Sequence, residues 1–181
     1  MATASWIKSL LDQRGVAYEE LHHREVFTAQ EVARSEHVSG HRLAKVVVVL
    51  ADHRPVELIV PASRRVVLGR VREVLGAGEV RLASEAEMDQ IFTECETGAI
   101  PPLRHGKDME VLMDASMQVE GEMLFQAGTH QDVIRLKFQD WLRLVSPRVA
   151  LFSELESAHF QTTFTDREDR GTARPERAEG E

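Results

Sequence analysis

The order of helix-like and strand-like segments predicts a single compact domain of the mixed α/β (α+β) class, with a mixed, largely antiparallel sheet surrounded by helices. The segments alternate irregularly, without the βαβ repeat that a purely parallel sheet requires. A tight turn at residues 52–54 joins two apolar runs and favours a hairpin. With 181 residues, the chain is long enough to bury a substantial core.

The N-terminal segment predicts a short amphipathic helix and then a strand. Apolar residues at helical spacing fall on one side of this helix, and Gly15 is a typical stop. The strand follows at residues 16–21 and contains Tyr18. The apolar side of the helix consists of Trp6, Ile7, Leu10 and Leu11.

The stretch of residues 27–50 combines a helix start, a glycine break and an apolar strand. Thr28 and Glu31 have the spacing of a capping box, so we expect a helix that begins there and ends near Gly40. Residues 43–50 are mostly β-branched and almost wholly apolar, which predicts a strand that is buried on both faces.

The remaining elements follow from the same patterns. A strand at residues 55–60 precedes a helix with an apolar stripe at residues 67–75. Ser84 and Glu87 form a second capping box, and the apolar stripe of the helix that they open includes Cys95. Further strands are predicted at residues 79–82, 110–113, 123–127 and 132–136, and a last helix at residues 138–145.

The composition is that of an ordinary globular protein from a reducing compartment. Hydrophobic residues make up 43% and charged residues 29% of the chain, and a single cysteine excludes an intrachain disulfide and favours the cytoplasm. No apolar run approaches the roughly 20 residues of a membrane helix, and the N-terminus lacks the pattern of a secretory signal. The net charge of −8 argues against nonspecific nucleic-acid binding, so we expect neither DNA nor a membrane as a partner.

We expect the folded domain to span residues 1–146 and an extension to follow at residues 147–181. The apolar periodicity fades beyond Pro147. From Asp166 onward the chain holds four arginines and six acidic residues, with two alanines as its apolar residues. This composition predicts disorder from about residue 166.

Lys45 is the one charged residue in the apolar strand predicted at residues 43–50. Its ammonium group either extends past the edge of the sheet into water or is held in place for chemistry. The residues around it allow both interpretations.

A proline-containing loop and a histidine after a strand are two more candidates. The loop contains Gly98, Ala99, Ile100, Pro101 and Pro102. The prolines stiffen it and have no N–H group, which leaves the three preceding amides to face a ligand oxygen; the alternative is a rigid turn. His130 follows Gly128 at a strand end, where it either donates to a substrate carbonyl, holds a water or has no such role.

Cys95 and a local excess of positive charge each allow two interpretations. Cys95 is either a nucleophile assisted by His105 or His130, or a structural thiol in the apolar stripe of its helix. Residues 41–81 hold eight lysines and arginines against four acids, which indicates either a phosphate-binding surface or a solvated helix face. The eight histidines show no metal-ligand spacing, so we expect no metal and no other cofactor.

The order of short motifs along the chain resembles the YbaK and prolyl-tRNA-synthetase-associated domain family. The motifs are, in order, FTAQEVA, AKVVVV, a strand ending in VPA, RLASEAE, CETGAIPPL and FQAGTH. The resemblance covers residues 1–146. It implies a compact mixed α/β fold and the hydrolysis of the ester that joins a wrong amino acid to a tRNA, carried out in trans. The implied partners are the acceptor end of an aminoacyl-tRNA and an aminoacyl-tRNA synthetase.

The resemblance also implies roles for particular residues. Lys45 matches the functional lysine of the family, Gly98 and Pro102 match its GxxxP loop, and His130 falls after its Ala-Gly strand end, which makes Lys45, Gly98 and His130 the implied catalytic residues. The chain departs from the family at Val46, which is polar in several editing members, so the substrate side chain stays open. The implied substrate-binding residues are Tyr18, Phe27, Thr28, Val46, Ala99, Ile100, Pro101, Pro102 and Gly128.

An aminoacyl ester is already activated, so an enzyme needs only to position it and to stabilise the developing oxyanion. No protein nucleophile is required if the neighbouring ribose hydroxyl, or a bound water, does the activating. A pocket lined by Phe27, Val46 and Ile100 would admit a small side chain and exclude larger ones. Two alternatives stay open: a noncatalytic binding or regulatory module on the same fold, and a thiol enzyme that uses Cys95.

Overall fold

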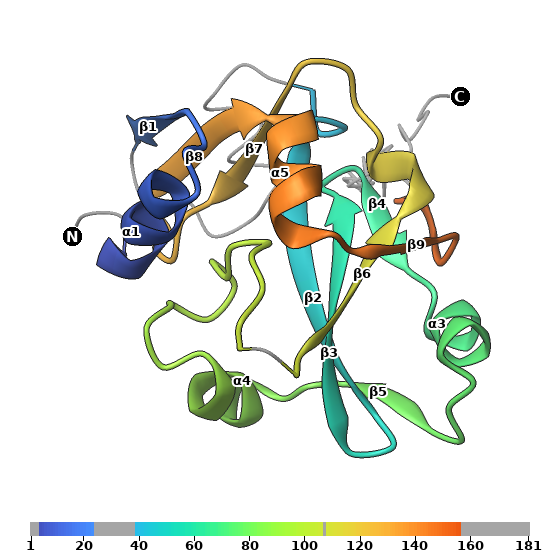
Figure 1. The fold of residues 1–181 in the computed structure, drawn as a ribbon. Helices are drawn as coiled ribbons and strands as arrows, with labels where there is room; N and C mark the ends of the chain where they lie inside the picture. Colours follow the sequence, from blue (N-terminus) through green and yellow to red (C-terminus); the bar gives the residue numbers. More distant parts are fainter. Residues whose placement is uncertain (1–3, 24–38, 107, 157–181) are drawn as a thin grey trace, which may run out of the picture.

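The computed structural model describes residues 4–23, 39–106 and 108–156, and in them it shows a mixed sheet of eight strands with helices packed around it (Figure 1). The helix predicted from Thr28, and with it Phe27, lies outside the described residues. The helices are α1 (Ser5–Gln13), α3 (Leu68–Leu75), α4 (Glu85–Ile91) and α5 (Phe138–Val145), with a short 3-10 helix at Ala115–Met117. The strands are β1 (Tyr18–His22), β2 (Leu43–Ala51), β3 (Arg54–Pro61), β4 (Arg64–Val66), β5 (Val80–Leu82), β6 (Glu110–Asp114), β7 (Glu122–Gln126), β8 (Asp132–Lys137), β9 (Arg148–Ala150) and β10 (Ser153–Leu155).

The strands run in the order β1-β8-β7-β2-β3-β6-β9, and β5 pairs with the far end of β2. The β2–β3 hairpin is antiparallel and turns through Asp52 and His53, both of which have positive φ. Adjacent pairs on either side of the hairpin, β2 with β7 and β3 with β6, are parallel. The sheet is therefore mixed, and the predicted fold class is confirmed.

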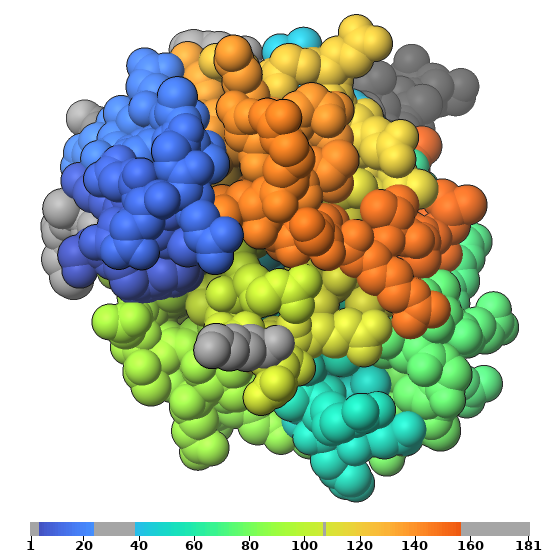
Figure 2. All heavy atoms as spheres, in the orientation of Figure 1, coloured from blue at the N-terminus to red at the C-terminus, as the bar shows by residue number. Residues whose placement is uncertain are grey.

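The two faces of the sheet carry separate cores. On one face, α1 and α5 cover a core that includes Ala44 of β2, Ile59 of β3 and Phe125 of β7. On the other face, Val60 of β3 and its neighbours pack with Val71 of α3. In the space-filling view, α1, α5 and the loop between α4 and β6 lie side by side on the face toward the viewer (Figure 2). No described helix has the length and apolar character needed to cross a membrane.

Helix α4 begins as predicted and ends earlier. Ser84 and Glu87 form the capping box, with the Glu87 amide donating to the Ser84 hydroxyl. The helix ends at Ile91, because Phe92 leaves helical geometry at φ −119° and ψ 60° and is buried against Val48 and Ile100. Cys95 therefore lies beyond the helix, and its predicted place in the stripe is wrong.

The compact fold continues past the boundary expected at residue 146. Strand β9 pairs with β6, and β10 pairs with β4. Between them, Phe152 is fully buried, and the backbone amides of Phe152 and Ser153 donate to the buried Asp114 carboxylate, each at 2.8 Å. Two short strands with weak apolar periodicity thus belong to the domain, and residues 157–181 lie outside the described part.

Candidate active site

The parallel strands β2 and β7 separate after only two paired residues. Leu43 pairs with Leu124 and Ala44 pairs with Phe125, and no pairing follows within the two described strands. Parallel neighbours that diverge leave a crevice at their carboxyl ends, which is a common place for a binding site in sheets of this kind. Lys45 lies at this point on β2.

The loop that carries Gly98 lies between the diverging ends of β2 and β7, and we call this region the wedge. On the β7 side, the Gly128 amide donates to the Ala99 carbonyl at 3.0 Å, and the Glu96 amide donates to the Gly128 carbonyl at 2.8 Å. On the β2 side, Ile100 packs against Val48. The predicted GxxxP loop is thus fixed between the ends of the two strands.

Gly98 and His130 contact one another in this wedge. Gly98 is exposed, has φ +90°, and a Cβ atom on it would lie 3.4 Å from His130 Cε1. The His130 ring donates from Nε2 to the Thr97 carbonyl at 3.0 Å, and its backbone amide donates to the Glu96 carboxylate at 2.7 Å. Because a carbonyl only accepts, this bond requires the proton on Nε2. His130 therefore holds the loop through Thr97.

The end of the loop is anchored in the core. The Pro102 carbonyl accepts from the Trp141 indole N–H at 2.7 Å, and Pro101 and Pro102 are both buried. Of the three amides predicted to be available, that of Ala99 is engaged, because it donates to the Glu96 carbonyl at 2.9 Å. The amides of Gly98 and Ile100 donate to no group in the described part of the chain.

Lys45 is held at the wedge without a strong partner. Its side chain is 22% exposed, and Nζ lies 3.5 Å from the Glu156 carboxylate and 3.5 Å from the Ala62 carbonyl. Both distances are at the long limit of a useful contact. Lys45 makes no described hydrogen bond or ion pair with Gly98 or His130. The ammonium group is thus partly buried and able to exchange its contacts for a ligand.

The proposed pocket residues divide between the two faces of the sheet. Successive residues of a strand point to opposite faces, so Val46 lies opposite Lys45 and packs beside Ile100. Tyr18 pairs with Leu136 and packs against the core under α1, on the same face as Val46. Val46 and Tyr18 therefore lie on the face opposite Lys45, and the predicted pocket of Phe27, Val46 and Ile100 stays a prediction because Phe27 lies outside the described residues.

The comparison with protein families decides the identity of the fold. The profile of the aminoacyl-tRNA editing domain matches residues 23–144. The chain belongs to the aminoacyl-tRNA editing domain family. It is an aminoacyl-tRNA deacylase, an enzyme that hydrolyses the ester between an amino acid and a tRNA.

Individual relatives agree with this assignment. The Multifunctional Ser/Thr-tRNA deacylase ProXp-y of Escherichia coli (strain K12) is 27% identical over 149 residues, which cover 80% of this chain and 89% of the relative. The crystal structure of a candidate trans-editing enzyme for prolyl tRNA synthetase superposes with a TM-score of 0.74 at 22% identity, over 85% of this chain and 98% of that one. A hypothetical protein of known structure has the same fold, with a TM-score of 0.74 at 19% identity over 82% of this chain and 99% of that one.

Cys95 of the editing domain is a poor nucleophile. Burial, with a smaller contribution from the Glu94 and Glu57 carboxylates, raises the pKa of its thiol to about 11. Almost no thiolate is present at neutral pH, and the thiolate is the reactive form. Cys95 lines a hollow of about 310 Å³ together with Glu96 and Gly128.

Three arginines from the basic segment at residues 41–81 contact strand β10 of the same chain. Arg64 donates to the Ser153 hydroxyl at 2.7 Å, Arg70 donates to the Ser153 carbonyl at 2.9 Å, and Arg65 forms an ion pair with Glu154. These three arginines were candidates for a phosphate-binding surface or a solvated helix face. Instead, the described contacts fasten β10 to the domain.

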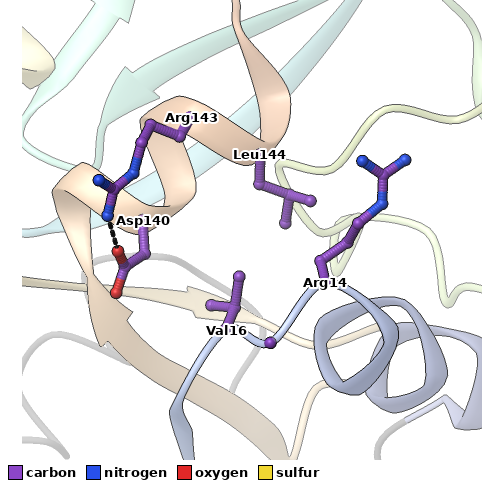
Figure 3. Close-up of a pocket in the computed structure, with 6 residues that line it drawn as sticks. Arg14, Val16, Asp140, Arg143 and Leu144 are labelled. Atoms are coloured by element: carbon purple, nitrogen blue, oxygen red, sulfur yellow. Dashed lines mark hydrogen bonds and ion pairs between the residues drawn. The ribbon is translucent and has the colours of Figure 1, made fainter.

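A hollow of about 300 Å³ lies away from the wedge, between the end of α1 and α5 (Figure 3). Arg143 on its rim forms an ion pair with Asp140. Arg14 extends on the opposite side, and Val16 and Leu144 lie between them. None of the predicted site residues lines this hollow.

Two residues near the wedge escaped the sequence analysis. Glu96 binds the His130 backbone, and Gln126 ends β7 with 7% of its surface exposed. The sequence did contain a signal for Gln126, because a polar residue there ends an otherwise apolar strand. The role of Glu96 depends on a long-range contact that no local pattern predicts. Among the described residues, no group of three or more His, Cys, Asp or Glu is placed to hold a metal ion.

Proposed function

We propose that this editing domain acts in trans on tRNAs that carry a small, wrong amino acid, and that it works by positioning the ester without a protein nucleophile. The observation that carries the proposal is the exposed Gly98 amide, held at φ +90° against His130 in the wedge between β2 and β7. An N–H group fixed in this way is suited to accept the charge that develops on an ester carbonyl oxygen.

In the proposed reaction, a water that is activated by the neighbouring ribose hydroxyl attacks the ester carbonyl carbon. The carbonyl oxygen becomes an oxyanion that accepts from the Gly98 amide. The carbonyl then re-forms as the C–O bond to the ribose breaks, and the ribose oxygen takes the proton that the attacking water gives up, which leaves the free amino acid and the free ribose hydroxyl. Lys45 binds the terminal phosphate or orients the carbonyl, and gives up its 3.5 Å contact with Glu156 to do so. His130 acts as a positioning residue through Thr97.

The proposed substrates carry serine or threonine. The named E. coli relative is a Ser/Thr-tRNA deacylase, and these side chains fit the expectation of a small substrate. Phe27 and Thr28, which lie outside the described residues, stay predicted pocket residues. We further expect an aminoacyl-tRNA synthetase as a partner and the cytoplasm as the location.

A hydrolysis assay tests the proposed substrates and mechanism. One tRNA is charged in turn with serine, threonine, alanine and proline, and the release of each amino acid is followed with and without the purified full chain. The proposal expects seryl- or threonyl-tRNA to be cleaved well above the buffer rate and Gly98→Val to remove that activity. No cleavage of seryl- or threonyl-tRNA, or a fully active Gly98→Val, would overturn it.

A further inference from the structure

We propose that Gln126 selects for a hydroxyl group on the amino acid of the substrate. This inference rests on the proposed function and names the residue that would give the wedge its preference for serine or threonine over alanine.

The side-chain nitrogen of Gln126 is buried and has no partner among the described residues. Gln126 is 7% exposed, and its Nε2 makes no hydrogen bond within the part of the chain that the structure describes. The great majority of buried side-chain polar groups in proteins have a partner, so a buried amide without one requires an explanation. Amide oxygen and nitrogen are interchangeable in assignment, and the inference uses the whole amide group.

Gln126 and Lys45 follow the end of the β2–β7 ladder on the same face of the sheet. Leu43 pairs with Leu124 in this ladder, and Lys45 and Gln126 each come two residues further along their strands, where the two strands have begun to separate. On its other side, Gln126 pairs with Val133 of β8. The amide therefore lies at the base of the wedge, on the face of the lysine.

The residues nearest Gln126 along the ladders on this face are apolar, and Lys45 and Arg135 are the charged residues that lie beyond them. On this face, Leu43, Leu124 and Val133 form an apolar cluster. In this apolar environment, an apolar residue at position 126 would pack well. A glutamine there is explained if a ligand supplies its hydrogen bonds.

The chemistry of the amide matches a hydroxyl group. A glutamine side chain offers both a donor and an acceptor, and a serine or threonine hydroxyl requires both. An alanyl side chain of similar size would fill the same space and leave the amide unpaired. Sites that hydrogen-bond a substrate hydroxyl discriminate strongly against the analogue that lacks it.

The test measures binding and turnover in parallel on the full chain. The binding probes are two adenosines whose 3′-amino group is joined through a stable amide to serine or to alanine, and affinity is measured by calorimetry. The turnover substrates are the same tRNA charged with serine or alanine. The variant is Gln126→Met, which keeps the length and removes the amide, with Gln126→Leu as a second version and circular dichroism as the check of folding.

The wild-type chain is expected to prefer the seryl probe by about tenfold or more, and both Gln126 variants are expected to reduce that preference to near one. The matched control is Gln118→Met, an exposed glutamine after the short 3-10 helix, which should leave the preference unchanged. Turnover of seryl- against alanyl-tRNA should follow the same ratios.

Two results overturn the inference. One is equal affinity of the wild-type chain for the two probes. The other is a Gln126→Met variant that weakens both probes equally and keeps the ratio, as a structural role would. A wild-type chain that prefers the seryl probe but cleaves neither ester would refute the proposed function and leave the role of Gln126 standing.

Discussion

His105 lies in the loop between α4 and β6, and His130 contacts the same loop at Thr97, yet the surroundings of the two rings differ. The His130 ring faces the exposed Gly98 and binds the Thr97 carbonyl. The His105 ring packs edge-on against Trp6 at 5.2 Å and Phe92 at 4.7 Å between ring centroids. The His130 ring is buried beside the exposed backbone of Gly98, whereas the His105 ring lies between two aromatic rings and borders a hollow of about 410 Å³.

Each histidine also has a carboxylate neighbour, which is Glu96 for the backbone of His130 and Glu57 for the ring of His105. Glu57 is fully buried, and its carboxylate lies 2.8 Å from His105 Nδ1. Burial raises the pKa of Glu57, although the neighbouring His105 acts in the opposite direction. Perturbed pairs of this kind often mark active sites. Here the pair fastens the far end of the loop to β3, so the shifted pKa of Glu57 marks an anchor of the loop that carries Gly98.

The largest effect that would test this contrast is expected at Lys45. Lys45→Ala should lower turnover of the best mischarged tRNA by about 100-fold, because the cation at the wedge is lost. Its melting temperature should stay the same or rise, since a partly buried charge leaves an apolar strand. Turnover is measured by timed deacylation assays and the melting temperature by thermal unfolding. The control is Lys137→Ala, at an exposed lysine. A fully active Lys45→Ala would refute the proposed mechanism.

Gly98→Val and Gly106→Val form a matched pair. Both glycines have positive φ, +90° and +84°, so valine at either position should cost about 1–3 kcal/mol of stability. Only at Gly98 does a side chain meet His130, whereas Gly106 has nothing within 4 Å. We expect turnover to fall by roughly tenfold or more in Gly98→Val and to stay near the wild-type value in Gly106→Val. Equal losses would show that the loop acts only through stability.

The buried pair predicts a pH dependence of stability. The folded pKa of Glu57 lies above its ordinary value of 4.5, so the unfolded chain releases this proton at lower pH than the folded chain. The contribution of Glu57 to the free energy of unfolding therefore falls as the pH rises from about 4.5 through the folded pKa. Glu57→Gln should remove that fall, which urea unfolding at a series of pH values measures. Parallel pH curves for the two proteins would contradict the assignment.

The smallest effect is expected at Cys95. With a thiol pKa of about 11, Cys95 supplies almost no nucleophile at neutral pH, so Cys95→Ser should keep turnover within about twofold of the wild-type value. The measurement is kcat/KM on the same mischarged tRNA, after a check of the melting temperature. An inactive but folded Cys95→Ser would restore the thiol-enzyme interpretation.

Local patterns predicted much of the fold. The capping box of Ser84 and Glu87, the apolar strand β2 and the amphipathic α5 all depend on residues near one another in sequence, and all are present. The end of α4 was missed because Phe92 leaves the helix to pack against Ile100, a contact made in the tertiary structure.

The site was only partly predictable for the same reason. The motif order along the chain predicted the Gly98 loop, which the structure does bring to His130. The face of Tyr18 depends on β1 pairing with the distant β8, and the arginine contacts depend on β10, which has too little apolar periodicity to be recognised. The place of Gln126 on the same face as Lys45 likewise follows from the register of β2 with β7.

The short ladder between β2 and β7 also bears on how the enzyme first becomes active. It joins segments far apart in sequence, and β7 in turn is held by β8. Contacts of this kind form late, because a long stretch of chain must be closed before they stabilise anything. A nascent chain on the ribosome therefore has Lys45 and the Gly98 loop well before it has the wedge, which is complete only after β8 has emerged.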